Sequence, residues 1–411
     1  MSVMSEVARK HNFRVLLHEK PFAGVNGSGK HNNWSLGTDR GAQLFAPGKT
    51  PRDNFQFITF VVNVMAAVHK HNALLKASIM SATNAHRLGA NEAPPAIISI
   101  FTGSQLSQAL EAILASDSAD FSVLKGKEGY STGLAQIPEI LIDNTDRNRT
   151  SPFAFTGNRF EFRAVGSSDN CADAMLTLNT AVAESLEQFA DALEGSKDFE
   201  ADLQALIRSV LIKHKRILFN GNGYDDAWLA EAERRGLLNL RTTPEALPYY
   251  LADKNVALFT KHRVYTRTEM EARYEIHLEN YSKVLNIEAL TMLEMARRDI
   301  MPAVSSYLRE LSETAAAIHA ASVTADCSYE ESIIPEMSAL LGDAYRKVRR
   351  LDEALMGAKT VEGSQALANY YRDKVFSAMA ELRITIDQLE TMTPSDKWPV
   401  PSYGDLLFSV R

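Results

Sequence analysis

The spacing of apolar and polar residues divides the chain into two differently patterned parts. In the first part, strand-like apolar runs alternate with Gly/Asn-rich loops, which predicts a strand at 14–18, a helix at 54–76 and a buried strand at 96–101. From residue 172 the pattern is almost entirely helical, with a first helix at 172–193 and long helices predicted at 267–298, 300–321, 329–356 and 366–392. An α/β part is therefore expected to precede a helical part, with a junction loop at 219–224.

The segment 153–165 carries two short strand signals separated at Gly157. In its second strand, NRFEFR, strict alternation places Arg159, Glu161 and Arg163 on one face and two phenylalanines on the other. One interpretation is a half-buried strand with a solvated charged face. The other is a metal-binding carboxylate flanked by guanidinium groups that hold phosphate or carboxylate.

The stretch 24–30 reads GVNGSGK and matches the first part of a phosphate-binding P-loop. A P-loop needs Ser or Thr after the lysine and a helix directly behind it, because the hydroxyl holds Mg²⁺ and the helix N-terminus faces the anion. Here His31 follows the lysine, and Asn32, Asn33 and Gly37 favour turns. We therefore expect a loop, whereas a P-loop kinase would require a helix starting at Lys30.

Composition limits the class of protein. With 411 residues, 45% hydrophobic and 23% charged, the chain suits a soluble protein of two domains. The net charge of −7 argues against nucleic-acid and anionic-membrane partners, and no apolar run approaches the roughly 20 residues that span a bilayer. The two cysteines fit a reducing cytoplasm and exclude a cysteine zinc site.

Two loops carry further candidate groups. HRLGANEAPP at 86–95 contains Arg87 and Glu92, and DRNRTSPFAF contains Arg149. Each loop could be a solvated turn, but loops also bring catalytic groups to substrates. Together with His31, Glu161 and the strand arginines, they fit a metal-assisted phosphoryl transfer to an acidic substrate with a loop carboxylate as base.

These motifs resemble those of the glutamine synthetases. HEKPFAGVNGSGKHNNWS resembles a block of the type III subfamily, HRLGANEAP is similar to the family's flap, and NRT and RFEFR are similar to its later motifs. KHRVYTRTEMEARYEIHLENY and SDKWPVPSYGDLLF resemble the type III helical extension. The resemblance implies an α+β fold, with an antiparallel catalytic-domain sheet and helices in 1–215 and a mainly α-helical domain in 216–411.

The resemblance also implies a role for each matched residue. The expected metal ligands are His31 and Glu161, and the expected catalytic groups are Arg149 for the transferring phosphoryl group and Glu92 for the ammonium proton. The remaining roles divide between the two substrates. The substrate-binding residues are Asn26, Gly27, Arg87 and Arg163, and the nucleotide-binding residues are Ser35 and Arg159.

The implied reaction joins ammonia to L-glutamate with ATP and Mg²⁺ or Mn²⁺, through γ-glutamyl phosphate, in a homo-oligomer of stacked rings. The sequence departs from the family at Ala154 and Asn33, and its flap is one residue shorter. It also lacks the E-x-E strand, two further glutamates and the β-grasp domain that precede the NGSG loop. We therefore expect a C-terminal part of the enzyme, inactive unless completed, with apolar surface exposed on its sheet. The alternative is a non-catalytic helical assembly or regulatory relic.

Overall fold

The computed structural model describes two compact units of the chain. Leu17–Tyr274 form the first, called the sheet unit, and Met1–Leu16 with Glu275–Arg411 form the second, called the helical unit. The residues described are 1–13, 15, 17–22, 24–47, 51–115, 129–130, 140–141, 150–322, 324–402 and 405. The expected domain boundary at residue 215 lies inside the sheet unit and remains a prediction.

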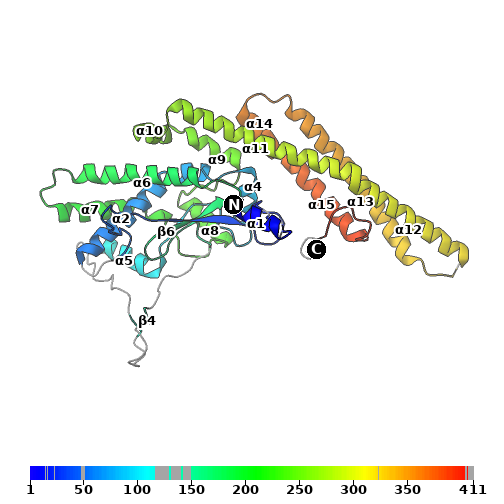
Figure 1. Ribbon diagram of the computed structural model, residues 1–411, viewed down its shortest axis with the longest axis horizontal. Helices are drawn as coiled ribbons and strands as arrows, with labels where there is room; N and C mark the ends of the chain where they lie inside the picture. The colour runs from blue at the N-terminus through cyan, green and yellow to red at the C-terminus, as the bar shows by residue number, and fades with distance from the viewer. Residues whose placement is uncertain are drawn as a thin grey trace. The chain divides into compact units, whose positions relative to one another are not determined.

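A four-stranded sheet with strand order β1-β6-β5-β2 lies at the centre of the sheet unit (Figure 1). β6 pairs antiparallel with both β1 and β5, while β2 pairs parallel with β5, so the sheet is mixed rather than antiparallel as expected. The parallel pair arises because the helix α5 and the segment 116–149 separate β2 from β5 in sequence, which gives a crossover rather than a hairpin. The strand bounds are β1 Gly29–Trp34, β2 Ile100–Phe101, β5 Phe153–Phe155 and β6 Phe160–Gly166, with a separate pair β3 Gly129–Tyr130 and β4 Ile140–Leu141.

Helices surround this sheet in the sheet unit. α2, α6 and α7 pack on one another, α4 packs on β6, and α3 packs on the short helices that follow residue 242. The α-helical bounds are α2 Pro51–Lys70, α3 Asn72–Ala77, α4 Ala82–Arg87, α5 Gly103–Ala115, α6 Ala172–Leu193, α7 Phe199–His214, α8 Asp226–Arg234, α9 Thr243–Ala246 and α10 Asp253–Lys261. Short 3₁₀ turns occupy Lys215–Ile217 and Leu247–Leu251.

The helical unit contains longer helices, with α13 packed against both α12 and α15 (Figure 1). The expected capping box opens α11, because the carboxylate of Glu269 accepts hydrogen bonds from the backbone and hydroxyl of Thr266 at 2.8 and 2.9 Å. The α-helical bounds are α1 Ser2–Lys10, α11 Arg267–Met295, α12 Met301–Ala321, α13 Ser328–Ala358, α14 Ser364–Tyr370 and α15 Ser377–Met392. The first residues of α11, up to Tyr274, belong to the sheet unit. π-helical segments at Ala296–Ile300 and Tyr371–Phe376 join α11 to α12 and α14 to α15.

Aromatic side chains form the core on one face of the sheet. Phe153 stacks on Phe160 with ring centroids 4.8 Å apart, and Phe45 meets Phe160 edge-on at 5.2 Å. The alternation predicted for NRFEFR is confirmed, because Phe160 and Phe162 are buried on this face. Gly157 separates β5 from β6 with a φ of +96°, a backbone conformation that suits glycine.

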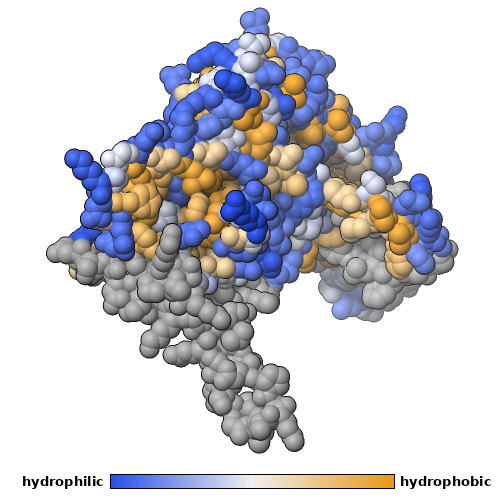
Figure 2. Space-filling model, turned by 60° about the vertical axis from the view of Figure 1, so that its left-hand side comes forward, coloured by the Kyte–Doolittle hydropathy of each residue, from blue (hydrophilic) through white to orange (hydrophobic). Residues whose placement is uncertain are grey.

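The expected exposed apolar surface on the sheet is wrong for the described residues. The apolar side chains of β2, β5 and β6 are buried, because the aromatic core covers one face and α4 packs on β6. The large exposed apolar side chains lie instead on helices and loops, and Figure 2 shows apolar side chains gathered in several patches bordered by polar ones on the face in view. Examples are Phe199 and Ile212 of α7 and Ile276, Ile287 and Leu290 of α11.

Several predicted elements differ from the structure. No strand includes Val15, Leu17 or His18, and residues 14 and 16 lie outside the described residues. The predicted buried strand at 96–101 shortens to Ile100–Phe101, and the helix at 54–76 divides at His71. The expected loop after residue 26 becomes the strand β1 from Gly29, because pairing with β6 outweighs the turn preference of its asparagines. A strand at this position also excludes the P-loop interpretation.

Candidate active site

A β-bulge brings two of the predicted site residues together. β1 and β6 pair in register except between Lys30 and Asn32, where His31 of β1 lies opposite two residues of β6, Arg163 and Ala164. The His31 imidazole points to the neighbouring strand, and its Nδ1 lies 2.9 Å from Oε1 of Glu161. His31 is exposed and Glu161 is half-buried, so the pair faces solvent from the sheet.

The other oxygen of Glu161 binds the arginine two residues further along β6. Oε2 accepts hydrogen bonds from Nε and Nη2 of Arg163 at 2.8 and 2.6 Å. Burial acts to raise the pKa of Glu161, but the hydrogen bonds and charge of Arg163 and the nearby His31 outweigh it and lower that pKa. The carboxylate is therefore ionised at neutral pH, in the form that can bind a cation.

Arg87, at the C-terminus of α4, lies beneath β6 and is only 3% exposed. Its guanidinium donates to the backbone carbonyls of Arg163 and Val165 at 2.9 and 3.2 Å, and to Oδ1 of Asn84 at 3.3 Å. In this conformation its hydrogen bonds are directed to the protein rather than to a substrate.

Close packing explains two glycines of the NGSG motif. A Cβ at Gly29 would clash with the guanidinium of Arg87, and a Cβ at Gly27 would clash with the carbonyl oxygen of Glu19. Neither glycine has a positive φ, so the requirement is for space and not for backbone conformation. The motif therefore holds a backbone segment against a buried arginine.

Glu19, which no sequence motif predicted as a site residue, is fully buried next to this segment. Its Oε1 accepts hydrogen bonds from the backbone and hydroxyl of Ser168 at 2.7 and 2.6 Å, and its own carbonyl accepts from the Ser28 amide at 2.8 Å. Burial acts to raise the pKa of Glu19, and the hydrogen bonds of Ser168 and Thr83 lower it overall. A lone glutamate before a Lys-Pro pair gives no signal in the sequence that it will be buried.

The flap loop carries Glu92 on a strained backbone. The amide of Gly89 donates to the carbonyl of Pro94 at 2.8 Å, which closes the base of the loop, and Asn91 donates to the carbonyl of Gly24 at 2.7 Å. Glu92 itself is exposed and has a φ of +55°, a conformation that is uncommon for a residue other than glycine. Such strain is typical of functional loops.

The remaining predicted site residues make no direct contact with the His31–Glu161–Arg163 group among the contacts described above. Asn26, Ser35 and Arg159 are exposed, with Asn26 in the loop before β1, Ser35 just after β1 and Arg159 just before β6. Arg149 lies outside the described residues. The structure thus brings His31, Glu161 and Arg163 into direct contact, and places Gly27 and Arg87 against each other on the neighbouring side of β6.

A second group of possible metal ligands lies elsewhere in the sheet unit. Glu184, Glu187 and His262 place one ligand atom each within 4.8 Å of one another. The ammonium of Lys261, however, lies 2.8 Å from a carboxylate oxygen of each glutamate. Burial acts to raise the pKa of Glu184, but hydrogen bonds from Lys261 and His262 lower it to about 2. This group is therefore a surface ion-pair network in which a lysine already neutralises the carboxylates.

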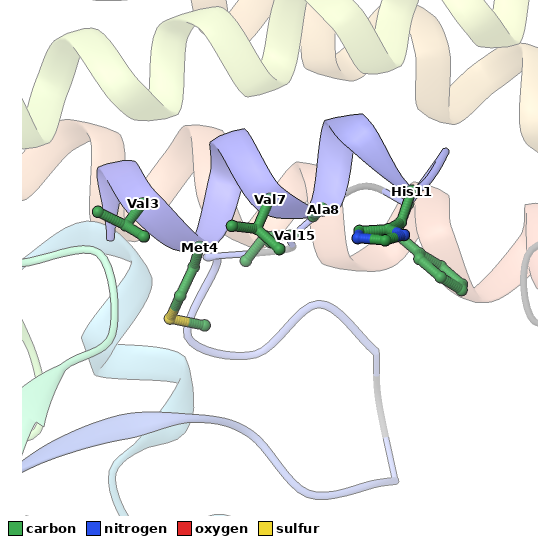
Figure 3. Close-up of a pocket in the computed structure, with 7 residues that line it drawn as sticks. Val3, Met4, Val7, Ala8, His11 and Val15 are labelled. Carbon is green, nitrogen blue, oxygen red and sulfur yellow. The ribbon is translucent and has the colours of Figure 1, made fainter.

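An apolar cavity of about 460 Å³ lies in the helical unit beside α1. Figure 3 shows Val3, Met4 and Val7 projecting from the same side of that helix, with His11 as a polar member of the lining. Ligand pockets combine apolar walls with a few convergent polar groups. One imidazole gives this cavity little capacity for catalysis, so we place the candidate active site in the sheet unit.

Comparisons with known proteins identify two family domains in this chain. The glutamine synthetase catalytic domain matches residues 1–100, which include β1 and the flap, and the glutamine synthetase C-terminal domain matches residues 202–319. Within the residues that the structure describes, no helix is both long enough and apolar enough to cross a membrane.

Three relatives are similar along essentially the whole chain. A glutamine synthetase of Bacteroides fragilis is 44% identical and one of Butyrivibrio fibrisolvens is 41% identical, each over 100% of this chain. A type-3 glutamine synthetase of Dictyostelium discoideum is 39% identical over 99% of it. The chain spans 57%, 58% and 56% of the lengths of these three proteins, respectively. On this evidence the chain belongs to the glutamine synthetase family.

Proposed function

We propose that this chain provides part of an active site that joins ammonia to L-glutamate at the expense of ATP. The observation that carries the proposal is the contact of His31 with a Glu161 carboxylate held ionised by Arg163, beside the bulge in β6 where Arg163 and Ala164 lie opposite His31. Bulges are common next to active sites, where they re-aim side chains of the bulged strand, which here is the strand of Glu161 and Arg163. A solvated charged strand face would not need a register shift to form.

The His31–Glu161 pair fits two positions of a divalent metal site. Adjacent ligands of an octahedral ion with bonds of about 2.1 Å lie about 3 Å apart, and the two ligand atoms here are 2.9 Å apart. Within the part of the chain that the structure describes, no third His, Cys, Asp or Glu joins them. When bound, Mg²⁺ or Mn²⁺ would offset the negative charge of the ATP phosphates.

The neighbouring residues would position the two substrates. Arg163 presents a buried guanidinium beside the metal pair, and Arg149 and Arg159 are proposed to face the phosphates. Asn26 and Gly27 would line the glutamate pocket with Arg87 behind them, and Ser35 would contact the nucleotide. In the reaction, an oxygen of the γ-carboxylate attacks the γ-phosphorus of ATP, and the bond to ADP breaks.

Glu92 would act in the second step. The nitrogen of ammonia attacks the carbonyl carbon of γ-glutamyl phosphate, inorganic phosphate leaves, and the Glu92 carboxylate takes the surplus proton. The flap that carries Glu92 would exclude water, which otherwise hydrolyses the intermediate. The exposure and positive φ of Glu92 suit a group on a loop that closes over substrate.

The test is glutamine formation by these 411 residues joined to the part of the Bacteroides relative that they do not match. We call this fusion the completed protein and expect it to form glutamine in an ATP-dependent reaction. Glu92→Ala should lower kcat by about 100-fold or more, the contribution typical of a general base, and should leave KM for ATP within about twofold, since Glu92 does not contact the nucleotide. Unchanged turnover would remove Glu92 from this role.

A second candidate function is a non-catalytic assembly or regulatory role. One observation favours it, namely that the guanidinium of Arg87 is directed to backbone carbonyls. The assay above separates the two candidates, because a relic would form no glutamine in the completed protein. We further propose a cytoplasmic location, consistent with two unpaired cysteines, and assembly into homo-oligomeric rings as in the family.

A further inference from the structure

The junction loop 219–224, FNGNGY, lies against two segments of the proposed active site. The amide of Gly223 donates to the hydroxyl oxygen of Thr150, the last residue of the NRT motif, at 2.8 Å. A Cβ at Gly223 would lie 3.1 Å from two oxygen atoms of Thr150 and 3.2 Å from Cγ of Pro95 at the end of the flap. Gly223 is thus buried between these two segments.

The side chain of Asn220 fixes this loop to the sheet. Its Oδ1 accepts hydrogen bonds from the amides of Thr102 and Gly103 at 3.0 and 3.2 Å, where α5 begins, and its Nδ2 donates to Ser107 at 2.6 Å. These bonds satisfy amides at a helix N-terminus that have no partner within the helix. Asn220 therefore holds the loop to the end of β2 and the start of α5, which lie far away in sequence.

Aromatic stacking holds the start of the loop. The ring of Phe219 stacks on Trp228 with centroids 3.7 Å apart, and its amide donates to the carbonyl of Ile100 at 2.9 Å. The guanidinium of Arg235 lies 5.8 Å from the Phe219 ring and 5.4 Å from the Trp228 ring. The loop is therefore anchored through Phe219, Asn220 and Gly223, which restricts the conformations that its backbone can adopt.

We propose that the junction loop is a positioning element of the proposed active site, in which Gly223 sets the spacing between Thr150 and the base of the flap. Thr150 and Gly223 are positioning residues and touch no reacting atom. An effect of this loop on catalysis is expected only if the proposed function is correct.

The first test compares Thr150→Val with Thr150→Ser in the 411-residue chain by hydrogen exchange. Valine has the shape of threonine without the hydroxyl acceptor, whereas serine keeps it. We expect Thr150→Val to accelerate exchange about tenfold in both 219–224 and 88–95, the effect of losing one hydrogen bond, with helix α13 unchanged. Thr150→Ser should stay within about twofold. Unchanged flap exchange in Thr150→Val would overturn the proposal.

A second variant acts through packing. Gly223→Ala adds a methyl group at 3.1–3.2 Å from Thr150 and Pro95, whereas the control Gly342→Ala in α13 meets its nearest neighbour at 3.7 Å, an ordinary contact. We expect faster exchange in the flap only for Gly223→Ala. A change confined to 219–224 would contradict a role in positioning the flap.

A kinetic measurement connects the loop to catalysis. In the completed protein, Thr150→Val should lower kcat about tenfold and leave KM for ATP within about twofold, with rescue by Thr150→Ser. Equal losses in both variants would contradict the proposal. Hydrogen exchange does not depend on turnover. If the completed protein has no activity, the proposed function is wrong, and the positioning role of the loop is then decided by the exchange data alone.

Discussion

Charged side chains occupy different places in the two units. In the sheet unit, Glu19, Lys76, Arg87 and Arg163 are buried, and three of these four lie around the β1–β6 pair and the NGSG segment. Among the described residues of the helical unit, the buried polar side chains are uncharged, and pairs such as Glu294–Arg298 lie exposed on one helix at 2.8 Å.

This difference in burial bears on where a functional site is expected. A buried charge costs free energy unless hydrogen bonds compensate it, so a fold retains such charges where they have a role or a complete set of partners. Exposed i,i+4 pairs each contribute only about 0.3–0.5 kcal/mol and are common on helix surfaces. The contrast is consistent with the placement of the proposed active site in the sheet unit.

The largest expected effect concerns the 411 residues assayed alone. The described residues supply one imidazole and one carboxylate to the proposed metal site, whereas Mg²⁺ normally takes about six ligands. Each 1.36 kcal/mol of lost transition-state stabilisation is about a factor of ten in rate. We expect glutamine formation to be at least about 10⁴-fold lower than in the completed protein. Comparable activity at ordinary Mg²⁺ would show that our ligand count is wrong.

The next largest effect concerns the carboxylate ligand. Glu161→Gln in the completed protein removes the charge that would bind the metal, and we expect kcat to fall about 100-fold, with more Mg²⁺ needed for half-maximal rate. Glu294→Gln is the matched control, because its carboxylate belongs to an exposed pair of the helical unit. Similar rates for the two variants would break the proposed contrast between the units.

A smaller effect is expected from the packing of the NGSG segment. Gly29→Ala would force its methyl group into the buried guanidinium of Arg87, and overpacking of this kind costs about 1–3 kcal/mol. Urea unfolding followed by tryptophan fluorescence should show this loss of stability. Gly342→Ala in the helical unit should be neutral or slightly stabilising, since alanine is the better helix former. Equal unfolding midpoints would mean that the segment moves away without strain.

The smallest expected effect is a loss of stability in acid. Burial lowers the pKa of His71 and of His214 from 6.5 to about 4, with nearby positive charges also lowering that of His214. Because the unfolded chain binds these protons first, stability should fall as pH decreases from about 6.5 to about 4. His214→Gln should reduce the difference in unfolding free energy between pH 7 and pH 5 by about 1 kcal/mol.

Much of the fold follows from local patterns in the sequence. The long helices were predicted within a few residues of their observed bounds, because their apolar spacing, capping box and terminating residues act over one or two turns. The alternation in NRFEFR likewise predicted that Phe160 and Phe162 lie together in the core. The resemblance of the NGSG, flap and RFEFR motifs identified the family, which the matched domains and relatives confirm.

Tertiary structure decided the features that depend on distant partners. Turn-forming asparagines became the strand β1 because β6 offers a partner, and the bulge of β6 opposite His31 exists only in that pairing. The parallel pairing of β2, the burial of Glu19 and the contact between Gly223 and Thr150 likewise join residues more than 50 positions apart. Local sequence propensity cannot predict such contacts, because they stabilise the protein only when the folded chain brings both partners together.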